Sequence, residues 1–167
     1  MAYNLLKGKR GIIFGALNEL SIAWKVAERA VEEGAEVVLT NTPVSIRLGT
    51  INTLAEQVGA VVIPADATSV EDLENLVDQT LAHFGGKIDF VLHAVGMSPN
   101  VRKSIPYEDI DYHNMMKTMD ISAISFHKLL QTLYKKDAMA EYGSVVSLSY
   151  IAAQRTVIGY NAMADAK

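Results

Sequence analysis

GIIFGALNELSIA, residues 11–23, runs from a short apolar segment through a turn with a single glycine into the start of a helix. The segment 11–14 is almost continuously apolar, which is typical of a strand buried on both faces. In a dinucleotide-binding fold, small residues after the first strand let backbone amides approach a pyrophosphate at the helix N-terminus, and Gly15 and Ser21 fit that need. Only the first glycine of the usual G-x-G-x-x-G pattern is present, so a plain strand-to-helix turn remains an alternative.

Four more apolar runs follow, and helical patterns alternate with them. Strands are expected at 11–14, 36–40, 60–63, 89–94 and 144–148. Helices are expected over about 22–33, 68–84, 109–136 and 156–167. Strands that alternate with helices form parallel sheets with helices on both faces. The predicted fold class is therefore α/β, a doubly wound, Rossmann-like parallel sheet.

Residues at the helix ends support these boundaries. Gly34 stands where a left-handed C-cap would end the first helix. Thr68 and Glu71 have the spacing of a capping box at the start of the second helix. The pair at 85–86, two glycines, would close that helix.

Composition narrows the class of protein. The 167 residues are enough for one domain, 1–167, with a sizeable core. A net charge of −4 argues against a nucleic-acid partner, which favours a basic surface. The chain has no cysteine, which excludes disulfides, thiolate zinc sites and cysteine nucleophiles, and no metal site is expected. No apolar run is long enough to span a membrane, and residues 11–17 fit a first strand better than a signal peptide, so a cytoplasmic location is expected.

In a doubly wound sheet, ligands bind at the carboxyl ends of the strands. The second strand ends in Thr40-Asn41-Thr42, with neither an acidic residue for a ribose diol nor an adjacent cation for a 2′-phosphate. Asp66 follows the third strand, where it could accept a hydrogen bond from an adenine amino group or simply cap a helix. His93 ends the fourth strand, where we expect it to be semi-buried and hydrogen-bonded rather than catalytic.

Two tyrosines and a lysine follow the fifth strand. In a helix, seven residues advance about 700°, so Tyr160 and Lys167 would share one face, with Met163 between them. A nearby ammonium favours the ionised form of a phenol, and a phenol can stabilise an oxyanion that forms when a hydride arrives. Tyr150 would face the same space. The alternative is that Tyr160 and Lys167 are ordinary surface residues.

Together these motifs resemble the enoyl-[acyl-carrier-protein] reductases of bacterial type II fatty acid synthesis, a divergent branch of the short-chain dehydrogenase/reductase family. The resemblance runs along the whole chain. It is carried by 15–23, Asp66, 93–96, 120–122, 148–150 and the stretch from Tyr160 to Lys167. The Y-x6-K spacing is specific to this branch, since ordinary members use Y-x3-K and this chain has Ala164 at that position.

The resemblance implies a role for each matching residue. The expected cofactor is NADH, with NADPH not excluded, and its binding residues would be Gly15, Ser21, Ile22, Asp66, Ala67, Val95, Gly96 and Lys167. The substrate would be a trans-2-enoyl group on acyl carrier protein, and Met97, Tyr150 and Met163 would bind it. The catalytic residues would be Tyr150, Tyr160 and Lys167, with Tyr160 stabilising the enolate.

The resemblance also implies a homotetramer. The Met-rich face of the long helix would suit an interface, although it would equally suit a core stripe. Members of the family continue past the lysine, so the chain resembles an N-terminal portion with its C-terminal strands missing, and we expect weak turnover or none from these 167 residues alone. Two other functions remain open: a ketone-reducing enzyme of the same superfamily, for which Ser147 lies 13 residues before Tyr160, and a non-catalytic nucleotide-binding or assembly module.

Overall fold

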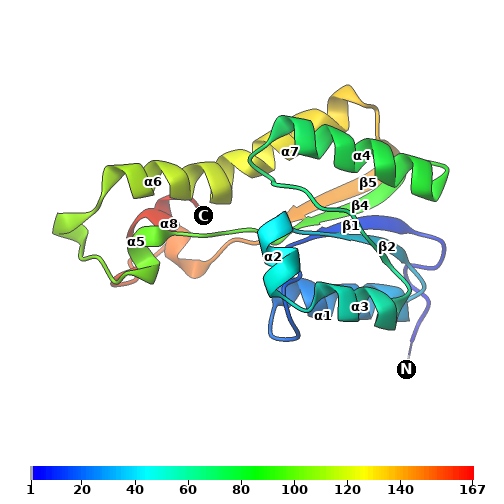
Figure 1. Ribbon diagram of the computed structural model, residues 1–167, viewed down its shortest axis with the longest axis horizontal. Coiled ribbons are helices and arrows are strands. Elements are labelled where there is room, and N and C mark those ends of the chain that lie inside the picture. Colours follow the sequence, from blue (N-terminus) through cyan, green and yellow to red (C-terminus); the bar gives the residue numbers. More distant parts are fainter. Residues whose placement is uncertain (1) are drawn as a thin grey trace.

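The computed structural model describes residues 2–167 and contains one parallel sheet of five strands (Figure 1). The strands are β1 (Arg10–Phe14), β2 (Glu36–Thr40), β3 (Val61–Val62), β4 (Ile88–His93) and β5 (Met139–Ser147). Their order is β3-β2-β1-β4-β5, and every neighbouring pair is parallel. This order confirms the doubly wound fold, and its direction reverses between β1 and β4, where such folds bind ligands.

Helices cover both faces of the sheet because β1 is apolar on both sides. Ile12 and Phe14 pack under α4 (Val70–Phe84) and α7 (Ser125–Lys135). Ile13 points the other way, toward α1 (Ile22–Glu32) and α3 (Ile51–Val58). Successive strand residues face opposite sides of the sheet, so the short apolar strand β1 packs into a hydrophobic core on each face. Figure 1 shows these two layers above and below the sheet.

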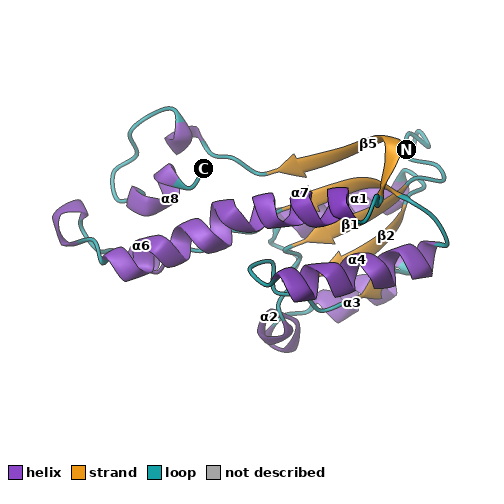
Figure 2. Ribbon diagram, turned by 90° about the horizontal axis from the view of Figure 1, so that it is seen from above, coloured by secondary structure: helices purple, strands orange, loops and turns teal. Residues whose placement is uncertain are grey.

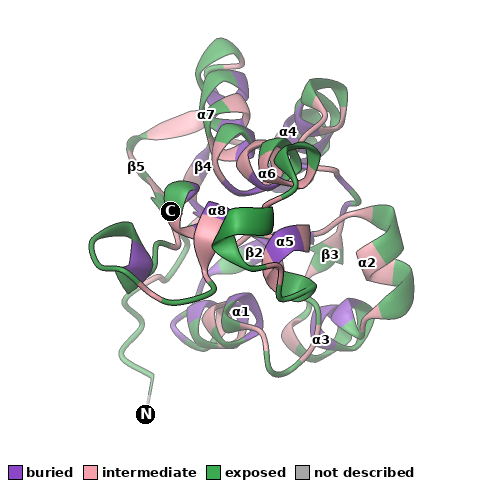
Figure 3. Ribbon diagram, turned by 90° about the vertical axis from the view of Figure 1, so that its left-hand side faces the viewer, coloured by how far each residue is buried: buried purple, intermediate pink, exposed green. Residues whose placement is uncertain are grey.

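The remaining elements gather beyond the carboxyl edge of the sheet. They are α2 (Pro43–Leu48), α5 (Pro99–Arg102), a 3₁₀ turn η1 (Tyr107–Asp109), α6 (Tyr112–Met119), a π-helical turn η2 (Asp120–Ile124), a 3₁₀ turn η3 (Ile151–Ala153) and α8 (Asn161–Asp165). Figures 1 and 2 show α5, α6 and α8 extending past the tips of β4 and β5. Figure 3, which looks onto this edge, shows exposed residues among these elements, and in α6 they include Tyr112, Met116 and Lys117.

The helix ends follow the predicted glycines but not the predicted capping box. Gly34 has φ +93°, which confirms the predicted left-handed cap, and Gly85 ends α4 as predicted, also with a left-handed φ of +61°. The cap of α4 is Ser69, whose Oγ accepts the Asp72 N–H at 3.2 Å. Thr68 lies one residue before this cap, and its hydroxyl instead donates to Asp66 Oδ1 at 2.8 Å.

Two short helices were not expected from the sequence. Thr42 caps α2 by accepting the Ser45 N–H at 3.2 Å, and Pro43 occupies the first helical turn, where its missing N–H costs nothing. Gly49 then separates α2 from α3. Each helix is too short to show a clear apolar period in the sequence.

The edge strands also differ from expectation. β3 is only Val61–Val62 instead of 60–63, while β5 covers Met139–Ser147 instead of 144–148. β5 is longer because Met139 pairs with Ile88 across a register irregularity, which an apolar run alone does not reveal.

The long helix is confirmed as a nearly continuous element, with η2 between α6 and α7. It begins at Tyr112 because Asp111 caps it by accepting the Asn114 N–H at 2.7 Å. The core-stripe interpretation of its methionines is wrong for Met116, which is 66% exposed.

The last helix is much shorter than 156–167. Gly159 has φ +77° and Asn161 has φ +37°, so α8 begins only at Asn161, and it ends at Asp165. Tyr160 and Lys167 therefore flank α8, and the prediction that they share one face of a longer helix is wrong. Among residues 2–167, no helix is both long and apolar enough to cross a membrane.

We predict that Gly15→Ala strongly destabilises the fold. Gly15 has φ +94°, and a Cβ there would lie 2.2 Å from the Ala94 carbonyl oxygen. Gly59→Ala is the matched control, since Gly59 has φ +67° but no atom within 4 Å of the place where a Cβ would lie. Urea denaturation should show a loss of more than about 3 kcal/mol for Gly15→Ala and about 1 kcal/mol for Gly59→Ala. Equal losses of stability in the two variants would contradict the close packing of the turn at Gly15 against the Ala94 carbonyl.

Candidate active site

The turn after β1 forms the floor of the site. Gly15 donates its N–H to the Thr40 carbonyl at 3.1 Å, which ties this turn to the end of β2. Its other side lies against the Ala94 carbonyl, which follows β4. Asn41 extends the connection by donating from Nδ2 to the Ala16 carbonyl at 3.1 Å. Three strand ends therefore meet at the switch point around one glycine.

Ser21 and Ile22 lie at the N-terminus of α1. The Ser21 hydroxyl donates to the Asn18 carbonyl at 2.6 Å and accepts the Leu17 N–H at 3.2 Å. Ser21 therefore braces the turn and makes no side-chain capping bond to α1. Ile22 is 62% exposed. The first amides of α1 thus lack a side-chain cap, as a helix N-terminus suited to an anion requires.

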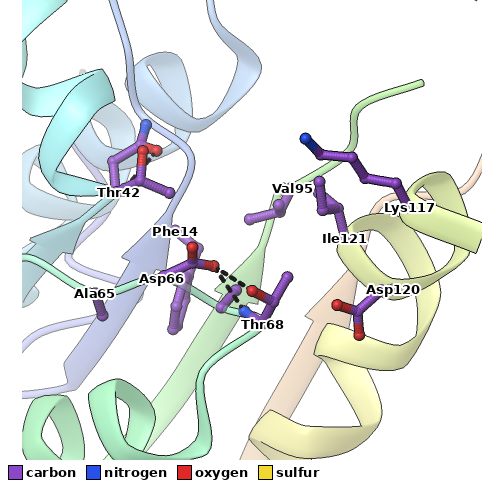
Figure 4. A pocket seen from close by; sticks show the side chains of 11 residues that line it. Phe14, Thr42, Ala65, Asp66, Thr68, Val95, Lys117, Asp120 and Ile121 are labelled. Atoms are coloured by element: carbon purple, nitrogen blue, oxygen red, sulfur yellow. Dashed lines mark hydrogen bonds between the residues drawn. The ribbon is translucent and has the colours of Figure 1, made fainter. Parts of the chain in front are cut away.

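A cavity of about 210 Å³ opens between the β3–α4 turn and the π-helical turn (Figure 4). It is lined by Phe14, Asn41, Thr42, Ala65, Asp66, Ala67, Thr68, Val95, Lys117, Asp120 and Ile121. The structure thus brings three predicted cofactor residues, Asp66, Ala67 and Val95, to one cavity. Asp66 is held by the Thr68 N–H and hydroxyl, which donate to its Oδ1 at 2.9 and 2.8 Å.

Lys167 lies at the ends of β4 and β5. Its Nζ donates to the Leu148 carbonyl at 2.7 Å and to the Val95 carbonyl at 3.4 Å. An ammonium has three donors, so these two bonds leave one for a further acceptor. Burial lowers the pKa of the Lys167 ammonium. Gly96 lies against this lysine, since a Cβ built on it would be in ordinary van der Waals contact with the Nζ at 3.5 Å.

The two tyrosines lie together beside this lysine segment. The ring centroids of Tyr150 and Tyr160 are 4.7 Å apart, with a tilt of 46° between the rings. Tyr150 is 45% exposed. Met163 is buried, and its Cε lies close to Gly96, 3.7 Å from the place where a Cβ of that glycine would lie. The structure thus groups predicted substrate and catalytic residues even though the expected long helix is absent.

Met97 is fixed by a serine on the π-helical turn. Ser122 Oγ accepts the Met97 N–H at 3.0 Å and lies 3.4 Å from the Met97 carbonyl oxygen. This pair anchors the segment after β4 to the long helix. In the sequence, Ser122 is marked only by the 120–122 motif that carries the family resemblance. Its position along the chain does not indicate that it contacts the Met97 backbone.

His93 is more buried than predicted, with no exposed surface. Its Nε2 lies 2.9 Å from Ser125 Oγ, and the Ser125 hydroxyl donates to the Ile121 carbonyl at 2.7 Å. Nδ1 has no hydrogen-bond partner within the described residues. The expectation of a fully hydrogen-bonded histidine is wrong for this nitrogen. Burial and the nearby charge of Lys167 lower the pKa of His93 from 6.5 to about 4.

The predicted residues fall into two groups rather than one. The cavity holds Asp66, Ala67 and Val95, while Gly96, Met163 and Lys167 lie together on the other side of Val95. Ser21 and Ile22 do not line the cavity. Sequence reasoning missed Asn41, Thr42, Lys117, Asp120 and Ile121 as lining residues. In the part of the chain that the structure describes, no three His, Asp or Glu side chains gather as a metal site would require.

The strand order, the glycine turn at the switch point and the cavity beside it define a Rossmann-like protein of the class that binds nucleotides at this edge of the sheet. Comparison with known proteins identifies the family. The family described as enoyl-(acyl carrier protein) reductase matches residues 15–167. The chain therefore belongs to the enoyl-(acyl carrier protein) reductase family.

Individual relatives agree with this assignment. Enoyl-[acyl-carrier-protein] reductase [NADH] 1 of Rhizobium meliloti is 36% identical over 168 residues, which cover 99% of this chain and 60% of the relative. The crystal structure of a FabI–NADH complex from Alistipes finegoldii has a TM-score of 0.97 and 72% identity, and the match covers 99% of this chain and 58% of that one. An Anaplasma phagocytophilum enoyl reductase in complex with NAD has a TM-score of 0.89 and 31% identity, and the match covers 100% of this chain and 63% of that one. The chain thus spans about 60% of the length of the curated relative.

We predict that His93 makes the fold sensitive to mild acid. Its pKa is lowered from 6.5 to about 4, so between these values the unfolded chain binds a proton that folded His93 does not. Stability should therefore fall as the pH drops through this window, with up to about 3 kcal/mol due to His93. Denaturation curves at pH 7 and pH 4 measure the loss.

His93→Gln should remove this part of the loss, since an amide does not titrate. His127→Gln is the control, because His127 is exposed on α7, and it should keep the full pH dependence. An unchanged pH dependence in His93→Gln would contradict the account.

Proposed function

We propose that the chain is the cofactor-binding part of an NADH-dependent enoyl-[acyl-carrier-protein] reductase of type II fatty acid synthesis. The observation that carries the proposal is the position of Lys167, whose ammonium is bound to the Leu148 and Val95 carbonyls beside Gly96. This places a cation with a spare donor at the carboxyl edge of a doubly wound sheet. Family membership and the names of the relatives support the same reaction.

The residues fit a dinucleotide in three places. Gly15 keeps the floor open, since a Cβ would reach the backbone of the next turn. The cavity of about 210 Å³ is smaller than the roughly 300–1,000 Å³ of a drug-sized site, so it suits one base rather than a whole dinucleotide. Asp66 and Ala67 would bracket this base. Lys167 would donate to ribose hydroxyls on the nicotinamide side, and Ser21 and Ile22 would lie near the pyrophosphate.

The bound nicotinamide would supply a hydride to the β-carbon of the enoyl thioester. The chain's task is then to stabilise the negative charge that develops on the thioester oxygen. Tyr160 would donate its phenolic hydrogen bond to that enolate oxygen, and this interaction is strongest in the transition state. A proton delivered to the α-carbon completes the reduction.

The tyrosine pair would also shape the acyl site. Tyr150 packs against Tyr160 with centroids 4.7 Å apart, so it would help to orient the Tyr160 ring. Met97 and Met163 would provide apolar walls for the acyl chain.

The proposal also covers the partner protein, the cellular location and the oligomeric state. Acyl carrier protein would present the substrate, and the protein would act in the cytoplasm as a homotetramer. The exposed Met116 on α6 favours an interface over a core role for this helix.

We predict that Tyr160→Phe, in the protein expressed from its complete reading frame, lowers turnover of crotonyl thioester at least about 100-fold and leaves NADH affinity unchanged. The phenol stabilises only the developing charge, so kcat should fall while the Kd for NADH stays constant. Tyr134→Phe is the control, because Tyr134 is 87% exposed on α7 and does not line the cavity. Full turnover in Tyr160→Phe would exclude this role.

A ketone-reducing activity is the competing possibility. NADH oxidation with crotonyl and acetoacetyl thioesters separates the two reactions. We expect turnover of the crotonyl substrate, and turnover of the acetoacetyl substrate alone would overturn the proposal.

A further inference from the structure

A lysine outside the cavity joins its two walls. Lys128, on α7, donates from Nζ to the Thr68 carbonyl at 2.8 Å and to Asp120 Oδ1 at 2.8 Å. Thr68 belongs to the wall formed by the β3–α4 turn, and Asp120 belongs to the wall formed by the π-helical turn. Figure 4 shows these two residues on opposite sides of the cavity. Lys128 itself does not line it.

The π-helical turn makes this bridge possible. Asp120 and Lys128 are eight residues apart, and in a regular α-helix they would be rotated about 80° from one another around the axis. The wider π turn, Asp120–Ile124, rotates each residue through a smaller angle and so reduces this offset. The side chains then meet on the side of the helix that faces the β3–α4 turn.

The β3–α4 turn belongs to the apolar cluster that Ala67 shares with Leu129 of α7. Its other polar bonds do not reach the long helix: the Thr68 N–H and hydroxyl donate to Asp66, the Asp66 N–H donates to Asp72 Oδ2 at 2.9 Å, and the Ala65 N–H donates to the Asn41 carbonyl at 3.0 Å. These bonds shape the turn but do not set its distance from the long helix. The bond from Lys128 to the Thr68 carbonyl spans 60 residues of sequence and joins the turn directly to the long helix.

We propose that Lys128 is a positioning residue that sets the width of the base cavity without touching the nucleotide. The inference rests on the proposed function for the identity of the ligand as NADH. Its side chain is 24% exposed and that of Asp120 is 43% exposed, so the ion pair by itself adds little to global stability. Its effect is preorganisation: the adenine side of the ligand meets walls that are already at the right separation.

The test compares binding of three probes to the full chain and its variants by calorimetry. NADH contains the adenosine half, AMP is that half alone, and reduced nicotinamide mononucleotide lacks it. Lys128→Met keeps the length and packing of the side chain but removes its donors, and Lys128→Arg keeps the charge. Lys136→Met is the matched control, because Lys136 also joins α7 to α4, through Asp78 at 2.8 Å, with the same 24% exposure and no contact with the cavity.

Lys128→Met should raise the Kd for NADH and for AMP at least about tenfold and change the Kd for the mononucleotide less than about twofold. Lys128→Arg should restore most of the affinity, and Lys136→Met should match the wild type with all three probes. The proposal is overturned if Lys128→Met binds NADH and AMP normally, if all three probes weaken equally, or if Lys136→Met weakens NADH to the same extent. If the wild-type protein binds AMP but not NADH, the proposed function is contradicted and the role of Lys128 is not. If the wild-type protein binds neither AMP nor NADH, both are overturned.

Discussion

The backbone of Gly15 lies directly against the carbonyl of Ala94, and the carboxyl edge of the sheet is organised around that contact. β1 and β4 pair in register, with Phe14 opposite His93, so the turns that follow them start at the same level. A side chain at Gly15 would collide with the second turn at 2.2 Å. With a glycine there, the chain diverges on either side and leaves a crevice where a doubly wound sheet reverses its strand order.

The short segment after β4 joins the two halves of the site. Val95 lines the base cavity with its side chain, while its carbonyl oxygen accepts a bond from Lys167. Behind it, His93 is buried and bound to Ser125, which in turn donates to Ile121 on the cavity wall. The cavity and the lysine are therefore attached to the same piece of backbone, and a displacement of that segment would move both.

The sequence predicted the fold class, the central strands and the helix ends at Gly34 and Gly85, because apolar runs and glycines report local backbone needs directly. Position at strand ends and resemblance also pointed to Asp66, Ala67 and Val95, which the structure brings to one cavity. It failed where distant contacts decide the outcome. The last helix is short because Gly159 and Asn161 adopt positive φ, and Asp120, which lines the cavity, begins a π turn that the sequence did not predict. The Lys128 bridge depends on α7 packing beside the β3–α4 turn, which no local pattern encodes.

The central claim is that one edge of the sheet holds a dinucleotide with its base in the cavity and its nicotinamide half at Lys167. A crystal structure of the chain with NADH tests this most directly. The account predicts adenine between the Asp66–Thr68 turn and Ile121, and a ribose hydroxyl within hydrogen-bond distance of Lys167 Nζ. Adenine bound elsewhere, or a Lys167 that contacts no part of the nucleotide, would contradict it.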